Sequence, residues 1–171
     1  MTLSIKKFAC AICLTLQTFS TFPALAADPT VTVKVISEAG AQHALAAAEQ
    51  EAEKLHAPCA IAVVDSSGIL VAFLKMDGVR AGSPDLAIGK ARTSALLQRP
   101  SSETEDNIDK GRVAFITAGL MTLRGGMPLL AGKEVVGAIG IASLNKDNDV
   151  AIAQAAAADF TSFSASQPPS H

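Results

Sequence analysis

The chain has no tryptophan and no tyrosine, and its aromatic residues are seven phenylalanines. Proteins that bind single-stranded nucleic acid by stacking present several aromatic side chains to the bases, so this chain lacks the usual platform for that mode of binding. Its apolar residues, 49% of the sequence, are mainly alanine, valine, isoleucine and leucine. We therefore expect a core of small side chains that pack close together.

The sequence also lacks the short motifs of several enzyme classes. It has no Gly-x-Ser-x-Gly motif, which argues against Ser/His/Asp hydrolysis, and no Gly-x-x-x-x-Gly-Lys-Ser/Thr phosphate loop. After residue 26, no pair of cysteines or histidines has the spacing of zinc ligands. Gly137 and Gly140 lie within a predicted strand, so we interpret them as sites of close backbone packing and not as a dinucleotide-binding motif.

The first 26 residues have the three zones of a secretory signal peptide. Lys6 and Lys7 form a short basic region, residues 8–22 are mostly apolar but too few to span a bilayer, and Ala24-Leu25-Ala26 matches a small-x-small cleavage site. We expect cleavage after Ala26 and export, which makes the protein periplasmic or secreted. An uncleaved membrane anchor is the alternative, and the polar residues within this stretch argue against it.

Cleavage at this site leaves 145 of the 171 residues, enough for one domain with a hydrophobic core. Lys6 and Lys7 are lost with the leader, so 12 basic residues remain against 16 acidic ones and the net charge is −4. A chain with this charge and no basic stripe favours neither nucleic acid nor an anionic membrane as a partner. No later segment resembles a transmembrane helix. We assign residues 27–163 to a single domain and residues 164–171 to a disordered tail.

Cys59 is the one cysteine of the predicted mature chain, because Cys10 and Cys13 belong to the leader. A lone cysteine in an exported protein forms no internal disulfide. The apolar residues that follow it predict the start of a core strand, which favours a buried thiol. An intermolecular disulfide and a ligand role stay open as alternatives.

Hydrophobic periodicity predicts both strands and helices. The expected strands occupy residues 30–36, 60–65, 69–76, 129–131 and 134–143. The expected helices occupy residues 38–56, 83–98 and 149–163. Ser37 and Ser83 are expected helix N-caps, and residues 65–68 form a hairpin turn. This order gives an α/β (α+β) fold, in which an antiparallel sheet of about five strands is flanked by helices.

Two histidines and one methionine are candidate ligands. His43 lies opposite the apolar stripe of the first helix, so we expect it to face solvent or another subunit, as a surface histidine or an iron ligand. His56 at the end of that helix suits a C-terminal cap better than a ligand. Met76 is either a core residue or a soft haem ligand. The acidic clusters at residues 49–53 and 103–109 are interpreted as solvated helix faces.

A set of motifs in one order resembles a known family. The motifs are Ala60-Ile-Ala-Val-Val-Asp65-x-x-Gly68, Phe73-x-x-Met76-Asp77-Gly78, Ser83-Pro-Asp85-x-Ala87-x-x-Lys90-Ala91, Gly126-x-Pro128 and Gly137-Ala-Ile-Gly140. The set is similar to the GlcG/HbpS-type haem-binding family, which also includes the C-terminal domain of PduO-type cobalamin adenosyltransferases. The likeness covers residues 35–160, and the ordered set is more specific than any single motif.

The resemblance implies a compact α/β fold, self-association into homo-oligomers and, for several members, haem binding. It implies a histidine of the first helix as one option for the iron ligand, and His43 lies in that region. One departure is Leu144-Asn145, which stands where the family usually has paired glycines before the last helix. Leu144 is expected to fill the space that a glycine turn would leave for a ligand.

The first hypothesis is an exported haem-binding protein in which His43 is the axial iron ligand. Met76 and Lys90 are further candidate cofactor contacts, and Lys54 or Lys90 would lie near a propionate. Because one small subunit would leave much of the haem surface exposed to solvent, we expect a site between subunits. Lys90 has another interpretation, as a helix-surface lysine or the partner of Asp77 or another nearby carboxylate, Asp85.

Two other hypotheses belong to different classes. The second is an assembly or interaction protein without a cofactor, which would use small-residue helix faces as oligomer surfaces and bind a sensor or an enzyme. The third is an enzyme for a small metabolite, with Asp65, Asp77 and Lys90 as polar groups near one loop.

Overall fold

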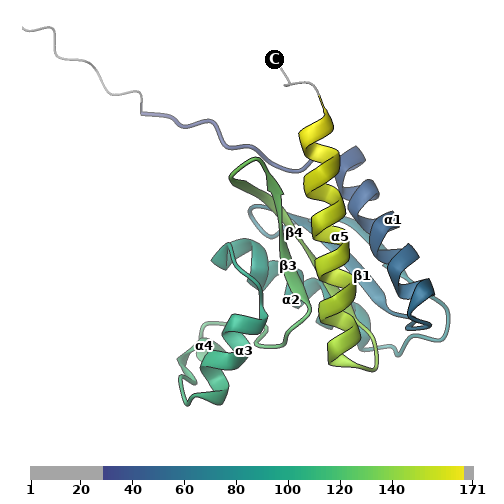
Figure 1. Ribbon diagram of the computed structural model, residues 1–171. Helices are drawn as coiled ribbons and strands as arrows, with labels where there is room; N and C mark the ends of the chain where they lie inside the picture. The colour runs from purple at the N-terminus through teal and green to yellow at the C-terminus, as the bar shows by residue number, and fades with distance from the viewer. Residues whose placement is uncertain (1–28, 168–171) are drawn as a thin grey trace, which may run out of the picture. The chain divides into compact units, whose positions relative to one another are not determined.

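The structure is a computed structural model that describes residues 29–167 (Figure 1). Residues 33–167 belong to one compact unit, and residues 29–32, which precede it, contain no helix or strand. The predicted leader, residues 1–26, lies outside the described residues, as do residues 168–171 of the predicted tail.

One antiparallel sheet is at the centre of this unit, with its strands in the order β2-β1-β4-β3. The strands are β1 (Ala60–Asp65), β2 (Leu70–Lys75), β3 (Gly126–Ala131) and β4 (Glu134–Ala142). Each neighbouring pair is antiparallel. The predicted fold class is therefore confirmed, with four strands in the described residues instead of about five.

The strand predicted at residues 30–36 is absent. Both neighbours of β4 are already in place, and its pairing with β1 ends at Asp65 opposite Gly137. Beyond that point Val136 O accepts one hydrogen bond, 2.8 Å long, from Ile36 N. Val33 and Val35 are exposed, because nothing in the sheet continues the pairing on their side. The alternating pattern is present, but none of these residues belongs to a strand of the sheet.

Helices cover both faces of the sheet. α1 (Glu38–Lys54) and α5 (Lys146–Ser166) lie side by side on one face, whereas α2 (Ser83–Leu97) packs on the other (Figure 1). Two short helices, α3 (Ser102–Asp109) and α4 (Ala114–Thr117), follow α2 before the chain enters β3. Among residues 29–167, no helix combines the length and the apolarity that crossing a bilayer requires.

Side chains of β1 alternate between the two layers, as strand geometry requires. Ile61 and Val63 belong to the core under α1 and α5. Ala60, Ala62 and Val64 belong to a second core under α2, which is made almost entirely of alanine. The expectation of a closely packed core of small residues is therefore met on the α2 side.

Two glycines of β4 permit this close packing. A Cβ atom at Gly140 would lie 2.1 Å from Ala87 O of α2, and one at Gly137 would lie 2.4 Å from Val64 O of β1. Neither position has room for a side chain. The prediction that these glycines serve close backbone packing is confirmed.

The ends of the helices differ in part from the predictions. Ser37 caps α1 as predicted, and its Oγ accepts a hydrogen bond from Gly40 N. Ser83 is not a cap: Gly82 occupies that position, and Ser83 is buried as the first helical residue. α5 begins at Lys146, where the Asn145 side chain caps it, and it continues to Ser166. Residues 164–166 of the predicted disordered tail are therefore helical.

Candidate functional site

The structure places the three predicted cofactor contacts in different environments. His43 lies on α1, beside the C-terminal part of α5. Met76 follows β2 and packs against the core under α1 and α5. Lys90 lies on α2, on the other face of the sheet, and its side chain is buried. The three residues do not form one site, so each is considered alone.

His43 contacts α5 through two interactions. Its Nε2 lies 2.6 Å from Asp159 Oδ2, and its ring stacks on Phe163 with centroids 4.0 Å apart and an interplanar angle of 14°. The side chain is 36% exposed. The prediction that His43 lies outside the core is correct, but a neighbouring helix of the same chain covers much of it.

The bond to Asp159 determines which ring nitrogen of His43 is free. An ionised carboxylate only accepts hydrogen bonds, so Nε2 must donate to it. In the neutral imidazole, Nδ1 then carries the lone pair and is able to bind a metal. Histidines that bind metals usually donate their other ring N–H to a carboxylate, a backbone carbonyl or a water molecule, and His43 has the first of these arrangements.

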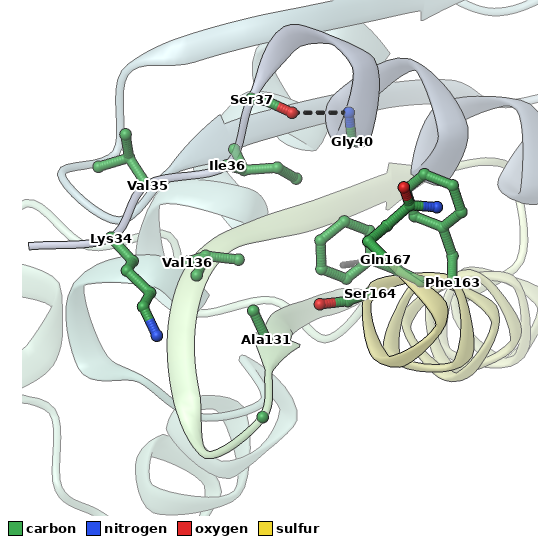
Figure 2. Close-up of a pocket in the computed structure, with 12 residues that line it drawn as sticks. Lys34, Val35, Ile36, Ser37, Gly40, Ala131, Val136, Phe163, Ser164 and Gln167 are labelled. Carbon is green, nitrogen blue, oxygen red and sulfur yellow. Dashed lines mark hydrogen bonds between the residues drawn. The ribbon is translucent and has the colours of Figure 1, made fainter. Parts of the chain in front are cut away.

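A groove of about 610 Å³ lies next to this histidine, and its lining residues come from residues 34–40, the β3–β4 hairpin and the C-terminal part of the chain. Ile36, Val136 and Phe163 contribute apolar side chains (Figure 2). Phe160, which is buried, also belongs to the lining. His43 does not line the groove, but Phe163, on which it stacks, does. Phe163 therefore separates the imidazole from the groove.

One basic side chain lines the groove. Lys34 is in the lining, and its Nζ lies 3.4 Å from Glu134 Oε2 in an exposed ion pair. Exposed pairs of this kind contribute little to stability, so Lys34 is available to another anion. Lys54 and Lys90 were predicted for this role from the sequence, and Lys34 was not. Lys54 is bound to Glu51 on α1 instead.

Lys90 is neither a surface lysine nor the partner of Asp77 or Asp85, and both of these predictions are wrong. Its Nζ donates to Asp149 Oδ2 at 2.6 Å and to Ile141 O at 2.8 Å, and both ionic side chains are 5% exposed. A buried ammonium that is already satisfied is poorly suited to bind a propionate at the surface. Lys90 is thus a structural residue in this fold.

Met76 has a sulfur partner in the core. Its Sδ accepts a hydrogen bond from Cys59 N at 3.4 Å and lies 3.9 Å from Cys59 Sγ. Cys59 is fully buried and free, as predicted, and its burial argues against an intermolecular disulfide. Burial also raises the pKa of the Cys59 thiol to about 12, so the metal-binding thiolate is strongly disfavoured. This environment favours the interpretation of Met76 as a core residue.

The remaining candidates have local roles. Asp65 Oδ1 accepts hydrogen bonds from Ser67 N and Ile69 N, which fixes the β1–β2 turn. His56 follows the cap of α1 with φ +49°, and its N–H bonds to Glu53 O. Among residues 29–167, no cluster of three or more histidine, cysteine or acidic side chains is arranged to hold a metal ion.

Comparison with known proteins identifies the family. The model of the HbpS-like family, described as haem-degrading protein HbpS-like, matches residues 36–158. The chain belongs to the HbpS-like family. Protein GlcG of Escherichia coli K12 is 37% identical over 108 residues, which cover 63% of this chain and 81% of GlcG.

Two solved structures of similar fold carry further information. A double mutant of HbpS from Streptomyces reticuli is 30% identical with a TM-score of 0.71, over 81% of this chain and 97% of that one. A structure described as a PduOC:heme complex is 25% identical with a TM-score of 0.66, over 73% of this chain and 94% of that one. The predicted family and fold are both confirmed.

This HbpS-like chain differs from the expectation at Leu144. Leu144 is 78% exposed and fills no enclosed space. The neighbouring residues are structural: Ser143 N donates to Asp149 Oδ1, and Asn145 caps α5. The substitution therefore changes the surface of this loop and leaves its backbone anchored.

Proposed function

We propose that this chain is an exported haem-binding protein in which His43 is the axial ligand of the iron. The observation that carries the proposal is the His43–Asp159 bond, which holds the imidazole through Nε2 and leaves Nδ1 as the free nitrogen. Family membership supports it, as does the similarity to the PduOC:heme complex. Haem would supply the iron, and the chain would supply the ligand, apolar walls and charge.

The groove beside His43 suits the porphyrin better than any other surface described here. Its volume of about 610 Å³ lies within the range of small-molecule sites. Phe160 and Phe163 provide aromatic walls, and Lys34 provides a cation for a propionate. A rotation of Phe163 would join the groove to the imidazole. The proposal therefore includes a movement of this one side chain when the cofactor binds.

Self-association forms the second part of the proposal. The groove is open, so a second copy of the chain over it would bury more of the haem surface from solvent. Separately, the edge strand β2 exposes Leu70 and Phe73, because α2 packs chiefly on the other strands. Leu96 of α2 is also 53% exposed. Exposed apolar side chains on a sheet edge are typical of surfaces that pair with another chain, and they also favour the assembly hypothesis.

Titration with hemin and with iron-free protoporphyrin tests the haem proposal. Because the chain lacks tryptophan and tyrosine, the protein concentration must come from amino-acid analysis. We expect saturable binding of hemin with a shifted Soret band, and weaker binding of the porphyrin, which cannot use His43. Equal affinity for the two would contradict iron ligation. No saturable binding of either would leave the cofactor-free assembly function, which light scattering of the same sample would test.

A further inference from the structure

A second hollow lies on the outer side of α2, and the proposed haem site does not include it. Its volume is about 450 Å³. One wall is a single face of α2, formed by Gly89, Arg92, Thr93 and Leu96, which recur at helical spacing. The other wall is the segment at residues 119–122, which precedes β3 and belongs to no helix or strand.

Gly89 explains why the segment lies so close to the helix. A Cβ atom at Gly89 would approach Met121 Cβ and Cε to 3.0 Å, so any larger residue would push the segment away. Leu96, Leu120 and Met121 supply apolar side chains to the hollow. These residues suit the hydrocarbon part of a ligand.

Three polar side chains complete the lining, those of Arg92, Thr93 and Thr122. Thr93 is 1% exposed, and its Oγ1 has no hydrogen-bond partner within the described chain. A buried hydroxyl without a partner is destabilising, because it has lost its hydrogen bonds to water and forms none within the protein. Arg92 donates through Nε to Gly68 O at 2.9 Å, which positions its side chain and leaves its terminal nitrogens for another acceptor.

The charge in the hollow has one sign. Arg92 is its only ionisable lining residue, and none of the eight lining residues is acidic. The main-chain groups of Leu120, Met121 and Thr122 make no hydrogen bond to the described chain, so they are also free to meet a ligand. A cation and a hydroxyl beside apolar walls indicate an amphipathic anion.

We infer that this hollow binds a small organic carboxylate with a short apolar body. The planar guanidinium of Arg92 matches a carboxylate in two-point geometry, and the Thr93 hydroxyl would donate to the same group. The hydrocarbon part would lie against Leu96, Leu120 and Met121. An inorganic anion would use Arg92 but would leave these apolar walls in water, so it would bind more weakly. The inference does not depend on haem binding.

Fluorine NMR with 4-fluorobenzoate tests this inference on the full mature protein. We expect saturable binding with a Kd of about 1 mM, a value that suits so small a ligand. The neutral analogue 4-fluorobenzamide should bind about tenfold more weakly or not at all. Inorganic phosphate, whose binding is measured by displacement of 4-fluorobenzoate, should also bind about tenfold more weakly or not at all. Equal affinity for the amide and the carboxylate would contradict the proposed role of Arg92. A higher affinity for phosphate than for 4-fluorobenzoate would contradict the proposed contribution of the apolar residues to binding.

Variants assign the binding to this hollow. Arg92→Gln should weaken 4-fluorobenzoate binding by about tenfold, and Thr93→Val by about fivefold, because each loses a hydrogen bond to the carboxylate. Arg112→Gln is the matched control, because Arg112 lies outside the hollow. Its Cζ is 5.1 Å from the centre of the Phe115 ring. Thr93→Val removes an unpartnered hydroxyl, so it should fold at least as well as the wild type. Unchanged affinity in folded Thr93→Val and Arg92→Gln would refute the inference.

Discussion

Lys90 of α2 and Asp149 of α5 form a buried ion pair that joins the two helical layers at one end of the sheet. The Nζ–Oδ2 distance is 2.6 Å, and Nζ also donates to Ile141 O of β4. The second oxygen of Asp149 accepts from Ser143 N at 2.7 Å. Gly125 makes room for the pair, because a Cβ atom there would lie 2.8 Å from Asp149 Cβ.

The first prediction concerns this pair. Lys90→Met should lower the free energy of unfolding by about 3–5 kcal/mol, because it leaves the Asp149 carboxylate buried without its counter-charge. Urea denaturation measures the loss. The double variant Lys90→Met/Asp149→Asn should lose less, since a neutral amide replaces the uncompensated charge and can still accept from Ser143 N. A single variant as stable as the wild type would show that the pair does not hold the layers together.

The second prediction concerns the contact between α2 and the sheet. Gly140→Ala should lower the free energy of unfolding by about 3 kcal/mol or more, because its Cβ would lie 2.1 Å from Ala87 O. Gly82→Ala is the matched control: Gly82 has φ −83° and open space around it, so its cost should stay below about 1 kcal/mol. Equal losses in thermal or urea unfolding would contradict the close approach.

The third prediction concerns the reactivity of Cys59. Burial raises the pKa of its thiol from the usual 9.0 to about 12. The native protein should therefore resist thiol reagents at pH 8, whereas the urea-unfolded protein should react at once. Labelling followed by mass spectrometry measures both rates. Rapid labelling of the native protein would place the thiol at the surface.

The same shift makes stability depend on pH. Between about pH 9 and pH 12 the unfolded chain loses the thiol proton while the folded chain keeps it, so stability falls as the pH rises. The contribution of Cys59 is fully present below pH 9. A Cys59→Ala variant should lack this part of the slope, and an identical slope in both proteins would contradict the buried thiol.

Elements with strong local signals could be predicted from the sequence. β1 was expected at residues 60–65 and is Ala60–Asp65, because a continuous apolar run followed by Asp-Ser-Ser-Gly determines a buried strand and its turn. The Ser-Pro-Asp start located α2 to within one residue, although Gly82 and not Ser83 occupies the cap position. The segment at residues 30–36 is the exception: its alternation predicted a strand, but alternation does not show whether a partner strand lies beside the segment.

The candidate site depended on contacts between distant parts of the chain. Asp159 lies 116 residues after His43, and Asp149 lies 59 residues after Lys90. Helical spacing alone assigned His43 to the outer face of α1, which is correct, but it gave no information about α5. One signal was available: Asp159 and Phe163 are four residues apart in a predicted helix, so they share a face. Such a pair suits a histidine on a neighbouring helix.

The fourth prediction concerns export. Expression of the full sequence in a Gram-negative bacterium should give a periplasmic or secreted protein that begins at Ala27, because Ala24-Leu25-Ala26 matches a signal-peptidase site. Intact-mass measurement of the purified protein determines its N-terminus. Recovery from the cytoplasm with Met1 or Thr2 as the first residue would contradict export.

The role of His43 as iron ligand is the central claim, and a hemin titration of two matched variants tests it most directly. His43→Asn and His56→Asn make the same chemical change on one helix, and asparagine tolerates the positive φ of His56. We predict that His43→Asn loses the shifted Soret band and that His56→Asn keeps it. Asp159→Asn should lower the affinity for hemin about tenfold or more, because it removes the group that orients the ligating histidine. An unchanged Soret band in folded His43→Asn would contradict the assignment of His43 as the ligand.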